Sequence, residues 1–262
     1  MQQMTLTKKD FYIIYQTNLI AAKGQLDVVE TLCKEKRAFF YIFQNNQARN
    51  KKAESEYNAC KRIYALLLGN WYEIILYRII YDKSSAAFSE TEIEQINCEK
   101  SISKKWNLVY TISRNKAENT FPISELPDFS IYFSSDYFKE IEELIMMRNR
   151  LSHGQWDIQL NSNKSNIRGL NFFIKYKNFA ELRLLRNKLD KMSLIIETLV
   201  ASKDKTESTF KNRLIQLKTE IDIIDRRINN ADDKKAADRK IRLIEKKLKK
   251  ISRKFDQSEQ QN

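Results

Sequence analysis

Glycine and proline are scarce in this sequence, with 4 and 2 residues among 262. Such low numbers exclude the many tight turns that an all-β fold requires. Apolar residues instead recur at helical spacing along almost the whole chain. We therefore expect an all-α protein.

Histidine and cysteine are equally rare. The chain has one histidine, and its three cysteines, Cys33, Cys60 and Cys98, are far apart with no CxxC pair. The sequence thus offers neither a disulfide framework nor a set of zinc ligands, and it lacks the glycine-rich phosphate loop of NTPases and kinases. We expect reduced thiols, a cytoplasmic location, and no metal or other cofactor.

The sequence also predicts no membrane-spanning segment. The N-terminus has no secretory h-region, and the most apolar runs are interrupted by Asn70, Glu73 and Arg78. The formal net charge is +13 with a pI near 9.5, which favours a polyanionic partner, nucleic acid before an anionic membrane. A solvated lysine-rich surface explains the charge equally well.

Helical periodicity predicts a long N-terminal helix that begins after a cap at Thr7, with Gly24 as a kink or break. A second helix over 55–82 is apolar around most of its circumference, which is typical of the centre of a bundle. A capping box at Thr91–Glu94 starts a third helix that runs to about 114, and 115–135 is expected to be a loop packed by its own aromatic residues. A cap at 134 or 135 precedes the next helix, and 179–200 is a further amphipathic one.

The C-terminal quarter carries two runs of apolar residues at the 3-4-3-4 spacing of a coiled-coil seam. The first extends from Leu214 to Ile228 and the second from Ile241 to Phe255. We expect an antiparallel hairpin, with one bent coiled coil as the alternative. Residues 203–256 hold 18 Lys and Arg against 10 Asp and Glu, so this basic segment either holds nucleic acid or dimerises. The expected division is 1–50 as an N-terminal helix, 51–202 as a helical domain, and 203–262 as a hairpin and tail.

The only histidine, His153, follows an apolar run and stands five residues after Arg148, with Gly154 positioned to end the helix. Asn149 and His153 are i,i+4 neighbours on one face, as are Arg148 and Ser152. Arg148 and His153 lie about 140° apart around an ideal helix. These two side chains therefore converge only if the helix loosens at its end, or if a second copy faces the first.

The segment Arg148-Asn149-Arg150-Leu151-Ser152-His153 resembles the motif of the HEPN superfamily, Arg followed by four to six residues and His. Gln155 and Trp156 after it are similar to bacterial members from defence and toxin–antitoxin loci. The resemblance covers about 55–200 and implies a HEPN-like helical bundle.

The resemblance also implies a metal-independent endoribonuclease that acts as a homodimer, with two motifs forming one cleft. His153 would be the general acid and base, Arg148 would stabilise the phosphorane charge, and Asn149 would orient the histidine or the phosphate. A polar residue from an earlier helix, Glu73 or Asn70, would complete the catalytic set. The residues expected to contact RNA are Arg150, Ser152, Gln155 and Trp156. An antitoxin or defence-system protein is a further expected partner. The alternative is a non-catalytic RNA-binding or scaffolding helical protein, and a third is a nucleotidyltransferase-controlled or membrane-surface role.

Overall fold

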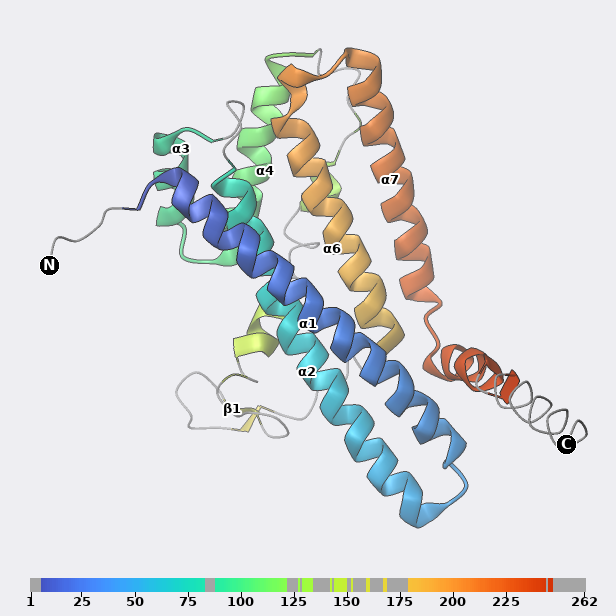
Figure 1. Ribbon diagram of the computed structural model, residues 1–262. Helices are drawn as coiled ribbons and strands as arrows, with labels where there is room; N and C mark the ends of the chain where they lie inside the picture. The colour runs from blue at the N-terminus through green and yellow to red at the C-terminus, as the bar shows by residue number, and fades with distance from the viewer. Residues whose placement is uncertain are drawn as a thin grey trace, which may run out of the picture.

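The computed structural model describes residues 6–82, 88–121, 127, 129–133, 142, 144–149, 152, 159–160, 167–168, 179–243 and 245–246. The predicted all-α class is confirmed (Figure 1). In this part of the chain the strands are limited to the two-residue pair β1 (Gln159–Leu160) and β2 (Ile167–Arg168), which is antiparallel.

The first two helices, α1 (Lys8–Ile42) and α2 (Gln47–Ile80), form a long antiparallel hairpin. Tyr15 stacks on Tyr77 near one end and Phe40 on Tyr57 near the other, which fixes the antiparallel direction. Thr7 caps α1 as predicted, in a capping box with Asp10. The predicted break at Gly24 is wrong, because α1 is continuous through it.

Helix α2 lies in the centre of the bundle, as its apolar circumference predicted. It begins eight residues earlier than expected, because Asn46 caps it after a short turn, so the expected division at 50/51 falls inside α2. By length and composition alone, residues 49–80 could cross a membrane; here 56% of their most apolar 18-residue window is buried in the bundle. Core helices of helical bundles share that composition.

Helix α6 (Phe179–Val200) has the predicted bounds and runs parallel to α2. Phe179 packs edge-on against Tyr64, and Arg78 pairs with Glu197 toward the other end. On α1, Glu30 binds Arg183 and Arg186 of α6. The three helices are thus tied together by both apolar and charged contacts.

The predicted third helix is in fact two. Helices α3 (Glu90–Cys98) and α4 (Ile102–Glu118) are separated by a turn, after which Ser101 caps α4. The capping box that starts α3 is Ser89 with Glu92, two residues before the predicted one. The aromatic residues after α4 pack on the bundle rather than on one another alone: Phe133 of η2 (Ser130–Phe133) stacks on Tyr110, and Phe121 stacks on Phe210.

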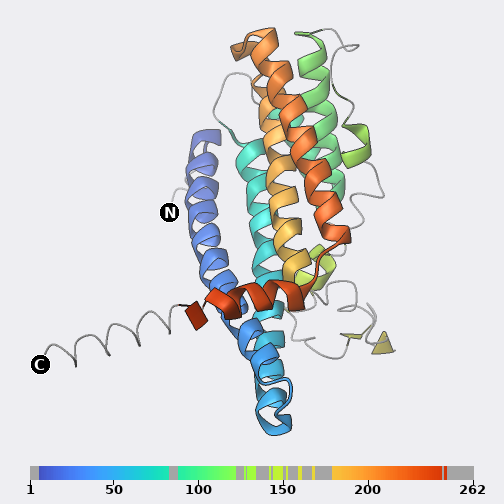
Figure 2. The same ribbon diagram turned by 90° about the vertical axis from the view of Figure 1, so that its right-hand side faces the viewer.

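The C-terminal seam has a different neighbour from the expected one. Helix α7 (Glu207–Asn229) follows the short η4 (Ser202–Asp204) and runs antiparallel to α6, as the pairs Lys188–Asp225 and Lys191–Glu220 show. Leu214, Leu217 and Ile221 are fully buried in the bundle core. Helical residues 233–243 then turn away from α7 and cross beside α1 (Figure 2). The seam of α7 is therefore filled by the bundle itself, and most of the predicted second run lies outside the described residues.

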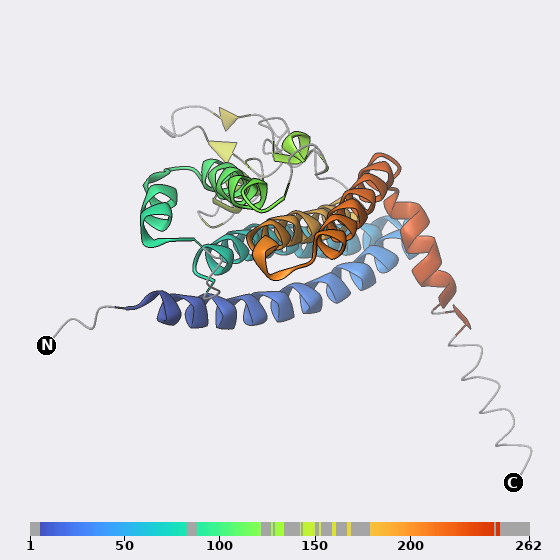
Figure 3. The same cartoon turned by 90° about the horizontal axis from the view of Figure 1, so that it is seen from above.

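The helices form layers that are visible from above (Figure 3). Helix α1 lies on one side, α2 and α6 are in the middle, and α4 lies on the other side. Helix α4 covers the face of α2 that α1 leaves open, where Trp106 stacks on Tyr72. The functional candidates lie on this α4 side.

Candidate functional site

The structure describes four of the predicted site residues: Glu73 on α2, Arg148 and Asn149 in the helical residues 144–149, and Ser152. His153, Arg150, Gln155 and Trp156 lie outside the described residues. The candidate site is therefore built from the arginine half of the motif.

The segment 144–149 is held against α2 by its own apolar run and by a glycine of α2. Leu144 and Met147 are fully buried in the core. A Cβ atom at Gly69 would lie 2.8 Å from the Cβ of Arg148, so the two backbones approach more closely than any larger residue would allow. Gly69 therefore fixes the position along α2 at which Arg148 packs against it.

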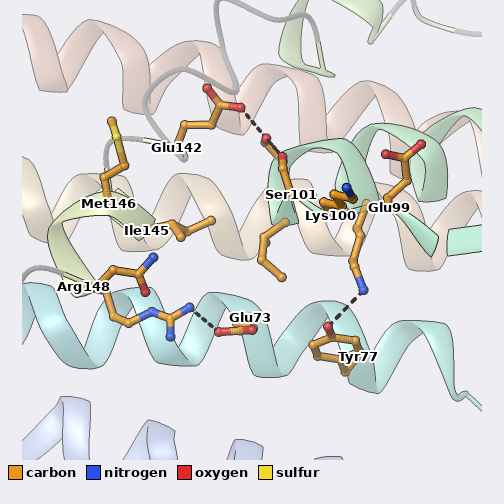
Figure 4. Close-up of a pocket in the computed structure, with 13 residues that line it drawn as sticks. Glu73, Tyr77, Glu99, Lys100, Ser101, Glu142, Ile145, Met146 and Arg148 are labelled. Carbon is orange, nitrogen blue, oxygen red and sulfur yellow. Dashed lines mark hydrogen bonds and ion pairs between the residues drawn. The ribbon is translucent and has the colours of Figure 1, made fainter. Parts of the chain in front are cut away.

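One helical turn beyond Gly69, Glu73 accepts a hydrogen bond from Arg148, with 2.5 Å between Oε2 and Nη2 (Figure 4). The Arg148 side chain is 22% exposed, so the ion pair is partly shielded from water. The Nε atom of Arg148 is buried and has no hydrogen-bond partner among the described atoms. Glu73 therefore contacts Arg148 across 75 residues of sequence, and its catalytic role stays a prediction.

Arg148 and Asn149 line a pocket of about 520 Å³ between α2, the start of α4 and the segment 144–149. Lys105 of α4 enters it from the other side and is only 8% exposed. Its Nζ donates to the Tyr77 hydroxyl at 3.2 Å and to the Asn97 carbonyl at 3.4 Å, and lies over the Tyr77 ring. Glu73 and Tyr77 are one turn apart on α2, so this face of α2 presents an acceptor to each cation.

The far wall of the pocket is polar as well. Ser103 donates to the carboxylate of Glu142 at 2.5 Å and contacts the Ser101 hydroxyl. Ile145 and Met146 contribute apolar surface beside it (Figure 4). The pocket therefore combines two fixed cations, carboxylates and an apolar wall, an arrangement suited to a ligand with both a charged and a flat apolar part.

The other predicted residues have simpler positions. Ser152 is exposed and donates to the Asn149 carbonyl at 2.7 Å, as expected near a helix end. Asn70, the alternative to Glu73, is half-buried on α2 and is not among the residues that line the pocket. In the described part of the chain, no three His, Cys, Asp or Glu side chains gather to hold a metal ion.

Sequence reasoning missed Gly69, Tyr77, Lys105 and Glu142. Only Gly69 carried a local signal, since a glycine inside an otherwise apolar helix often marks a close approach of two backbones. A lysine on an amphipathic helix gives no indication that it is buried, and Lys105 becomes visible only once Tyr77 and Asn97 are placed around it.

The geometry favours binding an anion at Arg148. Glu73 engages one amino group of the guanidinium and so fixes the plane of a side chain that is otherwise flexible. The fork has further donors for a phosphate oxygen. Comparison of the chain with protein-family models, with curated proteins and with solved structures finds no match.

Proposed function

We propose that this chain is a metal-independent endoribonuclease of a bacterial defence or toxin–antitoxin system, as the resemblance to the HEPN superfamily implies. The observation that carries the proposal is the Arg148–Glu73 ion pair at the edge of the pocket. A side chain that stabilises a transition state must be oriented before the reaction begins. Gly69 fixes the backbone of Arg148 and Glu73 fixes its guanidinium, which meets that requirement.

In the proposed reaction, the 2′-oxygen of a ribose attacks the adjacent phosphorus while His153 accepts the hydroxyl proton. The bond to the 5′-oxygen breaks, and a protonated His153 supplies the proton that this oxygen needs. Arg148 neutralises the extra negative charge on the phosphorane. The products are a 2′,3′-cyclic phosphate and a free 5′-hydroxyl, and no metal ion or cofactor takes part.

The proposed active form is a homodimer. Arg148 and His153 point about 140° apart on a regular helix, so two facing copies provide a simple way to place both around one phosphate. Asn149 is exposed beside Arg148, and it would orient the histidine or the phosphate. Arg150, Ser152, Gln155 and Trp156 are proposed to contact the flanking RNA.

The test is cleavage of labelled RNA by the purified chain in excess EDTA. We expect 2′,3′-cyclic ends from the wild type, and at least a 100-fold loss of rate in His153→Ala and Arg148→Ala. Arg148→Lys keeps the charge but loses the fork, so we expect it to lose most of the activity too. Arg114→Ala, which removes another partly buried arginine from its ion pair with Glu118, is the matched control and should cleave normally.

Full cleavage by a folded His153→Ala variant would refute the nuclease. Loss of cleavage by the wild type in excess EDTA would also refute the metal-independent nuclease. Expression of the wild type should also be toxic to bacteria, and His153→Ala should relieve the toxicity.

A second candidate is a non-catalytic RNA-binding protein, which one observation favours. Helical residues 233–243 and 245–246 expose a row of cations: Lys234, Lys235, Arg239, Arg242 and Lys246. Such a row binds phosphates regardless of sequence. Under this alternative, the chain binds RNA with a steep salt dependence but leaves it intact, and His153→Ala binds as the wild type does.

A further inference from the structure

Helix α1 has an apolar stripe that faces solvent. Its large members are 42–66% exposed and fall within about 120° of the helix circumference at 100° per residue: Ile13, Ile20, Val28, Leu32, Phe39 and Ile42. Of the fourteen large hydrophobic residues exposed among the described residues, eight lie in 6–42. The others are scattered over several elements, which is normal for a protein surface. The stripe on α1 is therefore an exposed apolar surface, interrupted by Glu35 between Leu32 and Phe39, of the kind that marks an interaction site.

The fold of the single chain does not require this stripe. The residues that α1 buries against the bundle, among them Leu26 and Cys33, are on the opposite side of the helix. An amphipathic surface helix usually carries charged residues on its outer side. Between residues 13 and 32, however, the outer stripe contains only apolar side chains, two threonines, an alanine and a glycine.

Gly24 lies in the middle of this stripe and has no explanation within the chain. It is inside a continuous helix, where glycine is unfavourable, and a Cβ atom there would meet nothing within 4 Å. Gly69, by contrast, is required because Arg148 packs on it. A glycine on an exposed helix face allows another backbone to approach closely.

The pattern of the stripe indicates what that other backbone is. In an antiparallel pair of identical helices with the two-fold axis at Gly24, residues equally far before and after Gly24 face one another. Ile20 then lies opposite Val28, Thr17 opposite Thr31, and the two Gly24 residues meet at the crossing point, whereas farther out Ile13 comes opposite Glu35. The central part of the stripe, from Thr17 to Thr31, is thus complementary to itself, as an isologous interface requires.

The size of the patch agrees with a dimer interface. The exposed fractions of the six large side chains together equal about three whole side chains. At roughly 150–200 Å² each, that is about 500 Å² of apolar surface per chain. A standard interface buries about 800 Å² per partner, of which rather more than half is apolar.

We propose that the solvent-facing stripe of α1 binds the same stripe of a second copy of this chain, antiparallel, with the two-fold axis at Gly24. This interface is separate from the cleft proposed around Arg148. Figure 4 shows α1 below α2 and Arg148 above it, so the α1 pair leaves the pocket open. The two interfaces lie on opposite sides of α2, and each is tested by itself.

The first experiment measures the molar mass of the full chain by analytical ultracentrifugation at micromolar concentration. We expect at least twice the 31.2 kDa of one chain for the wild type. Ile20→Arg and Gly24→Arg each place a charge at the centre of the stripe and should raise the dissociation constant of the α1 pair by about 100-fold or more. Ile131→Arg is the control, because Ile131 on η2 is the same residue type at 69% exposure against 66% for Ile20.

The second experiment places a cysteine on the proposed two-fold axis and does not rely on a substitution that disrupts the α1 interface. In a Cys98→Ser background, Gly24→Cys should form a disulfide between two copies on mild oxidation. Oxidised glutathione accepts the two electrons and leaves as two reduced molecules, while the two thiols lose their protons. Lys23→Cys, exposed on α1 but outside the stripe, should cross-link far less.

A molar mass of the wild type that Ile20→Arg and Gly24→Arg both lower, together with selective cross-linking through Gly24→Cys, supports the proposal. A monomeric wild type overturns it, as does a molar mass that both arginine variants leave unchanged, or equal cross-linking at the two cysteine positions. Circular dichroism of each variant confirms that it is folded. None of these results depends on RNA cleavage, so they are independent of the proposed nuclease.

Discussion

Two glycines inside long helices show how differently one residue type can act in this protein. Gly69 is in close contact with Arg148, whereas Gly24 faces open space. Helix propensity alone treats them alike, since glycine in a helix interior costs about 1 kcal/mol relative to alanine. Packing therefore decides the effect of substituting each one.

Gly69→Ala and Gly24→Ala are expected to change stability in opposite directions. The new methyl group at Gly69 would lie 2.8 Å from the Cβ of Arg148, and relieving that overlap should cost about 1–3 kcal/mol. At Gly24 the methyl group meets nothing within 4 Å of the same chain, so we expect a gain of about 0.5–1 kcal/mol. Urea unfolding at low protein concentration, where α1 is unpaired, measures both. A stable Gly69→Ala variant would contradict the close packing of Arg148 on α2.

The candidate site was predictable from the sequence only in part, for reasons that lie at this scale. Arg148 and Glu73 were found because each is a charged residue next to or inside an apolar run, which is a local pattern. Lys105 and Glu142 were not, because their roles depend on Tyr77 and Ser103, which come from other parts of the chain. A contact between distant segments leaves no trace in either segment alone.

At the level of single elements, helix α1 is joined to α6 by a shielded charge cluster. Glu30 binds Arg183 at 2.8 Å, Arg186 at 3.1 Å and Lys34 at 2.6 Å. Burial acts to raise the pKa of Glu30, but the hydrogen bonds and positive charges of Lys34 and Arg183 outweigh it and hold the pKa below the usual 4.5. Ionised Glu30 therefore stabilises the folded state, and the effect depends on pH.

The direction of the pH dependence follows from the lowered pKa of Glu30. Because the pKa of Glu30 is lower in the folded state, its contribution is complete above about pH 4.5 and is lost as the pH falls from there through the folded pKa. We expect Glu30→Gln to lose about 2 kcal/mol of unfolding free energy at neutral pH. The difference from the wild type should shrink toward pH 3.

Urea unfolding at several pH values measures this difference. Glu94→Gln, which changes an exposed carboxylate on α3, is the control and should follow the wild type. A constant difference between wild type and Glu30→Gln across the acid range would show that the ionised carboxylate of Glu30 does not support the fold.

Helices were easier to predict than their ends and partners. The bounds of α6 and the cap of α1 were predicted because an apolar period and a capping side chain are local features. The break between α3 and α4 was not predicted, since the apolar period continues across it and only Ser101 marks the restart. The apolar seam of α7 was predicted, but the element that packs on it was not. A row of leucine and isoleucine indicates that a helix face is buried, but it does not indicate which element covers that face.

For the whole molecule, the important consequence is where the globular part ends. Phe210, Leu214 and Leu217 of α7 are fully buried, so α7 belongs to the bundle core and not to a separable hairpin. The chain then continues to Asp233, which is buried where α1, α2 and α6 meet. Removing 203–262 would therefore unfold the bundle and could not test what the basic C-terminus does.

Asp233 attaches the C-terminal helix to the bundle. Its carboxylate accepts hydrogen bonds from Arg37 at 3.1 Å, from the Tyr57 hydroxyl, and from the backbone N–H groups of Phe179 and Ala180 at the start of α6. Arg37 is itself 2% exposed, so its charge would be buried without compensation if Asp233 were absent. One side chain thus both neutralises a buried cation and caps a core helix.

Two truncations separate this attachment from the proposed contact with RNA. A chain that ends after residue 230 loses Asp233, and we expect about 3 kcal/mol of destabilisation and a melting temperature lower by roughly 10 °C. A chain that ends after residue 246 keeps Asp233 and should melt as the full chain does. It loses five Lys and Arg residues against two acidic ones, so its affinity for RNA should fall and depend less steeply on salt.

Asp233→Ala should reproduce the stability loss of the shorter chain while retaining the basic residues. Differential scanning calorimetry and RNA binding at several salt concentrations measure the two effects. If the chain ending after 246 binds RNA with the affinity and salt dependence of the full chain, residues 247–262 make no phosphate contacts, and the exposed cations of 233–246 become the surface to mutate next.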